Sequence, residues 1–135
     1  MSGTTLVDSN VLLDVLTDDP GWARRSGRAL ERAADEGRLA INPLVYAEVS
    51  IGFERIEDLD RALPEDTFDR LALPWSAGFL AGKCFLRYRR SGGTRRSPLP
   101  GFYIGAHAAI EGLTLLTRDA RRYRTYFPTL DVVSP

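Results

Sequence analysis

Short runs of β-forming apolar residues alternate with longer helical patterns along this chain, and this alternation constrains the fold more than any other feature. The β-like runs lie at residues 4–8, 39–41, 68–73, 113–117 and 130–133. The helical patterns lie at residues 11–16, 22–36, 43–53, 55–63, 75–90, 102–111 and 119–126. Strands that alternate with helices predict a parallel sheet with helices on both faces. We therefore expect an α/β fold with three layers (α/β/α) and a central, mainly parallel sheet of four or five strands.

Length and composition predict one domain inside the cell. At 135 residues the chain can form one core but not two ordinary domains, so we expect residues 1–135 to be a single domain. No stretch approaches the roughly 18 consecutive apolar residues of a membrane span, and the first residues lack a charged segment followed by an apolar one. We expect a cytoplasmic protein without membrane contact. Cys84 is the only cysteine, which excludes an internal disulfide or a thiolate cluster and predicts packing on a helix.

Capping residues set several predicted boundaries. Asn10 is the predicted cap of the helix after the first strand, and Asn42 with Pro43 begins the helix after the second strand. Gly37 and Gly112 are predicted helix stops. Six aromatic residues have core-like spacings and predict packing or a partner surface rather than base stacking: Trp22, Trp75, Phe79, Phe85, Tyr103 and Phe127.

Three isolated carboxylates follow predicted strands at the same edge of the sheet. Asp8 ends the first strand, and Asp119 follows the strand at residues 113–117 by two positions. Glu48 lies on the second turn of the helix after the second strand and can lean over the same crevice. Because the carboxyl ends of parallel strands form the functional edge of such folds, we expect these three acids to lie together.

A cluster of three carboxylates predicts a bound cation. The acids repel one another, and their pKa values rise unless a cation is present. Ligation by oxygen alone favours Mg²⁺ or Mn²⁺, and such an ion activates water for attack on a phosphate, which is the chemistry of a nuclease. Taken singly, each acid is more simply a helix cap, a turn or a solvated position. Three neighbouring polar residues are predicted either to support the site or to serve as simple caps and turns: Ser9, Asn10 and Thr117.

Four segments together resemble a known family of nucleases. They are LVDSNVLL at residues 6–13, YAE at 46–48, LPGFYIGAHA at 99–108 and LLTRD at 115–119. In order and spacing they are similar to the four blocks of PIN-domain ribonucleases and, more narrowly, of the VapC toxins of bacterial toxin–antitoxin pairs. The resemblance implies Mg²⁺-dependent cleavage of a structured RNA by a metal-activated water, a homodimer, and inhibition by a small cognate antitoxin. It assigns Asp8, Glu48 and Asp119 as catalytic metal ligands.

One position departs from the family pattern. The family has an aspartate after the Leu-Pro pair, where this chain has Gly101. Glu111 cannot replace it, because ten helical residues separate the two by about 15 Å. A single Mg²⁺ can still bind three carboxylates with water in place of the fourth. Binding of a second ion and orientation of the attacking water depend more strongly on the missing acid. A natural disabled variant and an engineered inactivation both remain open.

The basic residues lie unevenly along the chain. Residues 1–82 hold eight Arg against fifteen acids, about −7, whereas residues 83–126 hold ten cations against two acids, about +8. Because arginine binds phosphate bidentately and stacks on bases, this asymmetry favours a nucleic-acid surface over a merely solvated face. The Gly-rich loop at residues 91–100 suits a grip on RNA, or alternatively on an acidic partner. The RNA-binding candidates are Arg89, Arg90, Arg95, Arg96 and Arg118.

Two other functions compete with the nuclease prediction. Because of Gly101, one alternative is that the chain is a non-catalytic PIN domain, which binds RNA or an antitoxin without cutting. A phosphoryl-transfer receiver or phosphatase would need a second acid beside Asp8 or a lysine at a late strand end, and neither is present. His107, the only histidine, is predicted to face away from the acids, because six residues from Gly101 correspond to about 240° around a helix.

Overall fold

The computed structural model describes residues 3–135, which form five strands and seven helices. In chain order these are β1 (Thr4–Val7), α1 (Ser9–Leu16), α2 (Ala23–Glu36), β2 (Arg38–Ile41), α3 (Pro43–Ser50), α4 (Ile56–Ala62), β3 (Phe68–Arg70), α5 (Trp75–Arg90), α6 (Pro100–Glu111), β4 (Thr114–Leu116), α7 (Ala120–Tyr126) and β5 (Val132–Val133). Every strand and helix expected from the sequence is present, with ends shifted by up to three residues.

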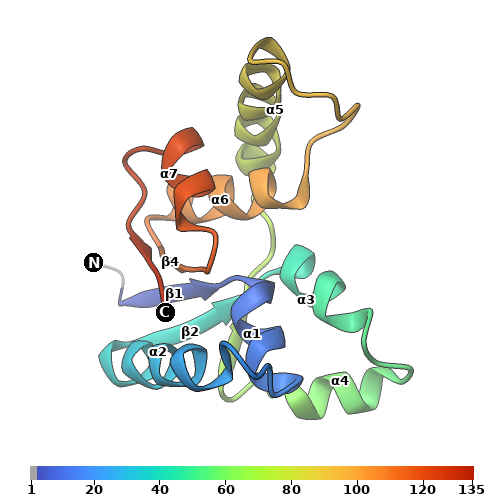
Figure 1. Ribbon diagram of the computed structural model, residues 1–135, viewed down its shortest axis with the longest axis vertical. Coiled ribbons are helices and arrows are strands. Elements are labelled where there is room, and N and C mark those ends of the chain that lie inside the picture. Colours follow the sequence, from blue (N-terminus) through green and yellow to red (C-terminus); the bar gives the residue numbers. More distant parts are fainter. Residues whose placement is uncertain (1–2) are drawn as a thin grey trace.

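All five strands are parallel and follow the order β3-β2-β1-β4-β5. The first strand is central: Leu6 pairs with Ala40 on one side and with Leu115 on the other. Figure 1 shows α1 and α2 below the sheet, α6 and α7 above it, and α5 rising beyond α6. The predicted α/β fold with helices on both faces of a parallel sheet is confirmed.

The central strands are apolar because both of their faces are covered. Leu6, Val7, Ala40, Leu115 and Leu116 are each at most 1% exposed. A parallel strand covered on both sides reads as a continuous apolar run rather than an alternating one. Burial of each large side chain contributes about 1.5–3 kcal/mol, so these strands form the rigid base on which the polar edge is built.

Helix caps agree with the sequence at most positions and differ at one. The Asn42 side chain accepts a hydrogen bond from the Val45 amide and caps α3, and Gly112 ends α6 with φ of 65°, a left-handed conformation that glycine adopts without a Cβ clash. The predicted cap at Asn10 is wrong. Asp8 caps α1 instead, because its carboxylate accepts the first free amide, that of Ser9, at 2.8 Å.

The aromatic residues divide into core and surface positions. Phe127 is 5% exposed and Cys84, on α5, is 3% exposed, as expected for packing residues. Trp75 and Phe79 are 97% and 70% exposed, so a core position is wrong for both. They lie one turn apart at the start of α5, on the side that the rest of the chain leaves uncovered. For these two residues a partner surface stays a prediction.

The helices give no sign of a membrane span. Across residues 3–135 none of them combines the length and the apolar character needed to cross a bilayer.

Candidate active site

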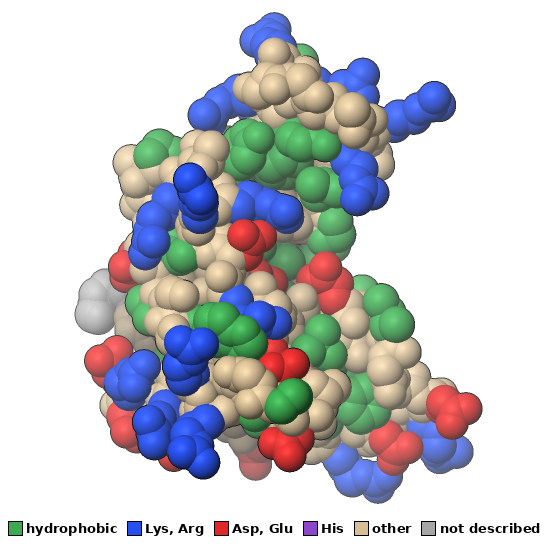
Figure 2. Space-filling view, viewed as in Figure 1, with side chains coloured by type: hydrophobic (Ala, Val, Ile, Leu, Met, Phe, Trp, Pro, Cys, Tyr) green, Lys and Arg blue, Asp and Glu red, His purple; other side chains and the backbone are tan. Residues whose placement is uncertain are grey.

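The three predicted acids lie at the carboxyl edge of the sheet. Asp8 follows β1 directly, Asp119 precedes α7 just after β4, and Glu48 is on the second turn of α3. Since β1 and β4 are paired neighbours, Asp8 and Asp119 leave the sheet side by side. Figure 2 shows acidic side chains in the middle of this face, beside a hollow between the α5 end and the α3–α4 end.

Asp8 is the most buried and most fully hydrogen-bonded of these acids. It is 5% exposed. Its Oδ1 accepts one hydrogen bond, from the Ser9 amide at 2.8 Å. Its Oδ2 accepts from Thr117 Oγ1 at 2.7 Å, from Tyr123 Oη at 3.2 Å and from Asn10 Nδ2 at 3.5 Å. The carboxylate is therefore held in one orientation by four donors from three parts of the chain.

Ser9 links Asp8 to Glu48. The Ser9 hydroxyl donates to Glu48 Oε1 at 2.8 Å, while its amide donates to Asp8. Burial raises the pKa of Asp8 above its usual value, and the nearby Asp119 carboxylate adds to the rise. Burial also raises the pKa of Glu48, with a further contribution from Asp8. These raised pKa values are the sign of anionic groups gathered where water screens them poorly.

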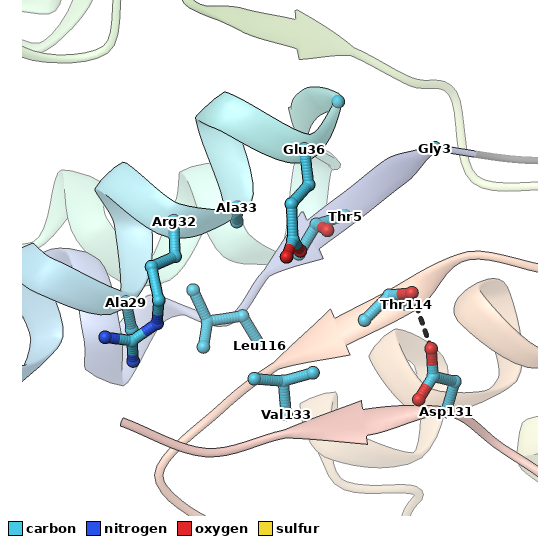
Figure 3. Close-up of a pocket in the computed structure, with 11 residues that line it drawn as sticks. Gly3, Thr5, Ala29, Arg32, Ala33, Glu36, Thr114, Leu116, Asp131 and Val133 are labelled. Carbon is cyan, nitrogen blue, oxygen red and sulfur yellow. Dashed lines mark hydrogen bonds between the residues drawn. The ribbon is translucent and has the colours of Figure 1, made fainter.

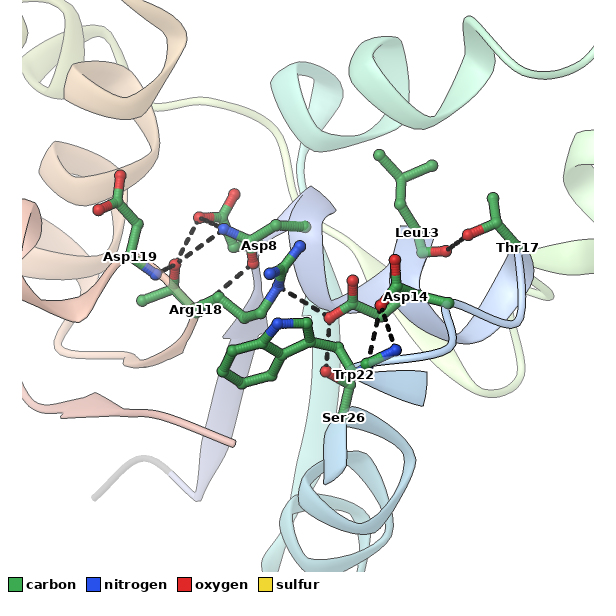
Figure 4. A network of polar contacts seen from close by, with 12 residues as sticks. Asp8, Leu13, Asp14, Thr17, Trp22, Ser26, Arg118 and Asp119 are labelled. Atoms are coloured by element: carbon green, nitrogen blue, oxygen red, sulfur yellow. Dashed lines mark hydrogen bonds and ion pairs between the residues drawn. The ribbon is translucent and has the colours of Figure 1, made fainter. Parts of the chain in front are cut away.

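Thr117 links Asp8 to the loop that carries Asp119. Its hydroxyl donates to Asp8 and accepts the Asp119 amide at 3.0 Å. The Asp119 carboxylate forms an ion pair with Arg122 at 3.3 Å. Asn10 holds the same loop, because its Oδ1 accepts the Arg118 amide at 3.1 Å. Figure 4 shows this chain of contacts between Asp8 and Asp119.

Tyr123 is a polar member of the cluster that the sequence analysis missed. It lies on α7 and is 4% exposed, and its hydroxyl reaches Asp8 Oδ2. Burial and the nearby carboxylates raise its pKa, so the hydroxyl keeps its proton and acts as a donor. The sequence offered one signal: Tyr123 lies one helical turn beyond Asp119, on the same face of α7.

Gly101 lies in the first turn of α6, close to Tyr123. A Cβ atom built at Gly101 would be 3.3 Å from the Tyr123 hydroxyl oxygen and 3.8 Å from its Cζ atom. No other acid in the sequence can take this place. The atom nearest to that Cβ position is a neutral hydroxyl donor, the Tyr123 oxygen.

The chemistry of the donor set fits a divalent cation. Burial raises the pKa values of Asp8 and Glu48, with smaller contributions from neighbouring carboxylates, and a hard cation with oxygen ligands would stabilise their charged forms. Within residues 3–135, however, no three acidic, histidine or cysteine side chains stand close enough to enclose a metal ion. Asp119, which faces Arg122, would have to turn toward Asp8 to complete a set of three.

The predicted RNA-binding arginines occupy two different environments. Arg118 is 32% exposed and pairs through Nε with the buried Asp14 at 2.9 Å, while its guanidinium lies 4.7 Å from the Trp22 ring centre. The other four stand at the exposed end of α5 and its following loop, where Figure 2 shows a group of basic side chains. They are Arg89, Arg90, Arg95 and Arg96.

His107 lies in the core rather than among the acids. It is fully buried, and its Nδ1 is 3.0 Å from the Asn42 amide nitrogen. Because Asn42 Nδ2 can only donate, His107 Nδ1 accepts, and the proton of the neutral ring is on Nε2, which has no partner among residues 3–135. Burial lowers the His107 pKa, and Glu111 partly opposes this.

This histidine predicts a loss of stability in mild acid. Its pKa is lower in the folded than in the unfolded chain, so its contribution is complete above about pH 6.5 and is lost as the pH falls below that value. The slope cannot exceed about 1.4 kcal/mol per pH unit for one proton. Urea unfolding between pH 5 and 8 measures it, with His107→Gln as the control. Equal pH dependence in the two proteins would contradict this assignment.

A separate hollow of about 310 Å³ lies away from the acids. Figure 3 shows it between α2, β1, β4 and β5, with Arg32 and Glu36 projecting from α2 and Thr114 bonded to Asp131 at 2.8 Å. None of the three predicted catalytic acids lines it. The carboxylate cluster at the sheet edge is therefore the candidate active site.

Comparison with known proteins gives one family match. A family model of the PIN domain matches residues 5–128. That span includes all three acids, Gly101 and Tyr123. No curated protein sequence matches the chain significantly.

Several solved toxin–antitoxin complexes contain a chain of the same shape. A chain of VapBC2 from Rickettsia felis, bound to a promoter DNA fragment, has a TM-score of 0.74 at 18% identity over 98% of each chain. A chain of VapBC-1 from nontypeable Haemophilus influenzae scores 0.72 at 16% identity over 97% of each. A chain of a toxin–antitoxin complex from Klebsiella pneumoniae scores 0.70 at 23% identity, over 96% of this chain and 95% of that one. At these identities the likeness demonstrates a shared fold.

Proposed function

Because the chain belongs to the PIN domain family, we propose that it is the toxin of a toxin–antitoxin pair and a metal-dependent endoribonuclease whose activity Gly101 impairs. The observation that carries the proposal is the pair of Asp8 and Glu48, joined through Ser9 at the sheet edge with raised pKa values. The structural likeness to chains of VapBC complexes supports the toxin assignment. Residues 1–135 act as one domain.

Asp8, Glu48 and Asp119 would hold Mg²⁺ or Mn²⁺. When bound, the ion polarises a phosphate oxygen and lowers the pKa of a water that attacks the phosphorus. Ser9 and Thr117 hold the Asp8 carboxylate in one orientation, so the carboxylate would be oriented before the ion binds. Thr117 and Asn10 fix the loop that carries Asp119.

The basic end of α5 would bind the RNA backbone. Arg90 and Arg96 are exposed, and Arg89 donates to the Arg95 carbonyl at 2.5 Å, which orders the loop. Arginines on an exposed loop bind phosphates without reading the bases. Arg118 would act less directly, since it is already paired with Asp14.

Two protein partners are part of the proposal. The solved structures that contain a similar chain are complexes with VapB-type and other antitoxins. A small antitoxin is therefore the expected inhibitor. A second copy of the chain is the other expected partner. Trp75, Phe79 and Ile51 are exposed apolar side chains, and such residues favour contact with another protein.

Cation-dependent cleavage of RNA tests the proposal. We expect slow cleavage of structured RNA by this chain with Mg²⁺ or Mn²⁺ and none with a chelator. We expect Glu48→Gln to lower the remaining rate by about tenfold, because it removes one charged oxygen ligand while keeping the side chain's size. Gel analysis of end-labelled RNA measures both.

A second candidate function is a PIN domain that binds RNA or an antitoxin without cutting. The observation that favours it is Gly101, which has no carboxylate and has a neutral hydroxyl, that of Tyr123, beside its Cβ position. RNA binding that is equally tight with metal or chelator, and no cleavage under either condition, would favour this function over the nuclease.

A further inference from the structure

Tyr123 connects the position of the missing acid to Asp8. Its hydroxyl oxygen is 3.2 Å from Asp8 Oδ2 and 3.3 Å from the place where a side chain at Gly101 would begin. The same oxygen therefore contacts Asp8 and lies beside the point where the side chain of a fourth acid would begin. The phenol comes from α7, whereas Gly101 is on α6, so this approach depends on the packing of two helices.

The hydrogen bonds of Asp8 divide unevenly between its two oxygens. Oδ2 is within reach of three side-chain donors, Thr117, Tyr123 and Asn10, at 2.7, 3.2 and 3.5 Å. Oδ1 accepts only the Ser9 amide. A carboxylate has about four acceptor sites, two on each oxygen. The three donors therefore occupy the acceptor sites of Oδ2, whereas one site on Oδ1 is free. Oδ1 is also the oxygen nearer to the Ser9 link with Glu48.

We propose that Tyr123 is a positioning residue of this site: its hydroxyl takes the space beside Gly101, completes the donor set on Asp8 Oδ2 and leaves Oδ1 as the oxygen that binds a cation. The part of this inference that concerns the cation rests on the proposed function. The part that concerns the hydrogen bond holds in the metal-free protein.

If Tyr123 has a purely structural role, removal of its hydroxyl is expected to have a different effect. The ring is buried and belongs to the core, so its loss would disturb packing. The hydroxyl alone can be removed by Tyr123→Phe, which keeps the ring. If Tyr123 only filled space, this change would alter neither the cation affinity nor the orientation of the Asp8 carboxylate.

Tyr126 provides a matched control. It lies on the same helix and its ring packs against Phe102, but its hydroxyl has no hydrogen-bond partner within residues 3–135. Isothermal titration calorimetry, in which Mn²⁺ is added to each metal-free protein, compares the Mn²⁺ affinities of the two variants. We expect Tyr123→Phe to weaken Mn²⁺ binding about tenfold or more, as is usual for outer partners of a metal ligand. We expect Tyr126→Phe to change it less than twofold. Equal affinity in Tyr123→Phe and the unaltered chain would overturn the positioning role.

A measurement without metal separates this inference from the proposed function. In proton NMR spectra the bonded hydroxyl of Tyr123 is expected to give a slowly exchanging downfield signal that Tyr123→Phe removes. Gly101→Asp places a stronger acceptor within reach of the same proton and should shift this signal, and Asp8→Asn should shift it as well. If neither change moves the signal, the inference fails. If both move it but the chain binds no Mn²⁺, the hydrogen bond stands and the metal-dependent function fails.

Discussion

Replacing Gly101 by aspartate is expected to raise cation-dependent RNA cleavage by about 100-fold, because it adds a charged oxygen ligand and a group that orients the attacking water. The new carboxylate would lie in the first turn of α6, where the helix dipole favours an anion. It would also meet the Tyr123 hydroxyl, which can turn to donate to it. Initial cleavage rates at saturating Mg²⁺ measure the effect.

Gly101→Asn is the matched control for this change. It has the same shape without the charge, so it should recover little of the rate. Asp8→Asn introduced together with Gly101→Asp should remove the gain, because Asp8 is the most firmly oriented of the acids. An aspartate variant as inert as the glycine form would refute the four-acid interpretation. Undiminished cleavage by the double variant would remove Asp8 from the catalytic set.

Replacing Asp14 by alanine is expected to lower the free energy of unfolding by about 2 kcal/mol, within the usual cost of leaving a buried polar group without a partner. Asp14 is 3% exposed; it accepts a hydrogen bond from Ser26 at 2.7 Å and forms an ion pair with Arg118 at 2.9 Å. Without it, the fully buried Ser26 hydroxyl has no acceptor and Arg118 loses its partner (Figure 4). Urea unfolding at pH 7 measures the loss.

Asp35→Ala is the control for this prediction. Asp35 is an exposed acid on α2, and an exposed substitution of this kind changes stability by less than about 0.5 kcal/mol. A double-mutant cycle with Arg118→Ala separates the ion pair from the Ser26 contact. If Asp14→Ala is no more harmful than Asp35→Ala, the network does not stabilise the fold. Because Arg118 adjoins Asp119, Asp14→Ala should also slow any cleavage that Gly101→Asp restores.

The sequence was sufficient for the architecture because local patterns and long-range packing agree. The strand at residues 113–117 was clear from its apolar run, and Asn42 and Gly112 marked helix ends that the structure confirms. For Trp75 and Phe79 the structure excludes the core alternative and leaves the partner surface, since helical spacing alone does not tell which face of α5 is left uncovered.

The site was predicted less completely than the fold. The sequence predicted Asp8 and Asp119 at one edge, because the carboxyl ends of parallel strands meet there, whereas the direct pairing of β1 with β4 comes from the structure. The helical spacing from Asp119 could have pointed to Tyr123, but its hydrogen bond to Asp8 could not be predicted, since it depends on how α7 packs over α6. The ion pair between Arg118 and Asp14 was missed for the same reason: nothing in the local sequence links the loop after β4 to α1.

The sheet edge is assembled from the two ends of the chain, and this affects when the site can exist. Asp8 is translated before its donors Thr117 and Tyr123, which lie 109 and 115 positions later in the chain. Because β1 has one of its two neighbours in β4, a nascent chain that has not yet reached residue 117 has neither the strand nor the hydroxyls that orient Asp8. Ribosomes that stall or terminate early would therefore release a product without the site. The arrangement of donors around Asp8 is therefore complete only after residue 123 has been synthesised.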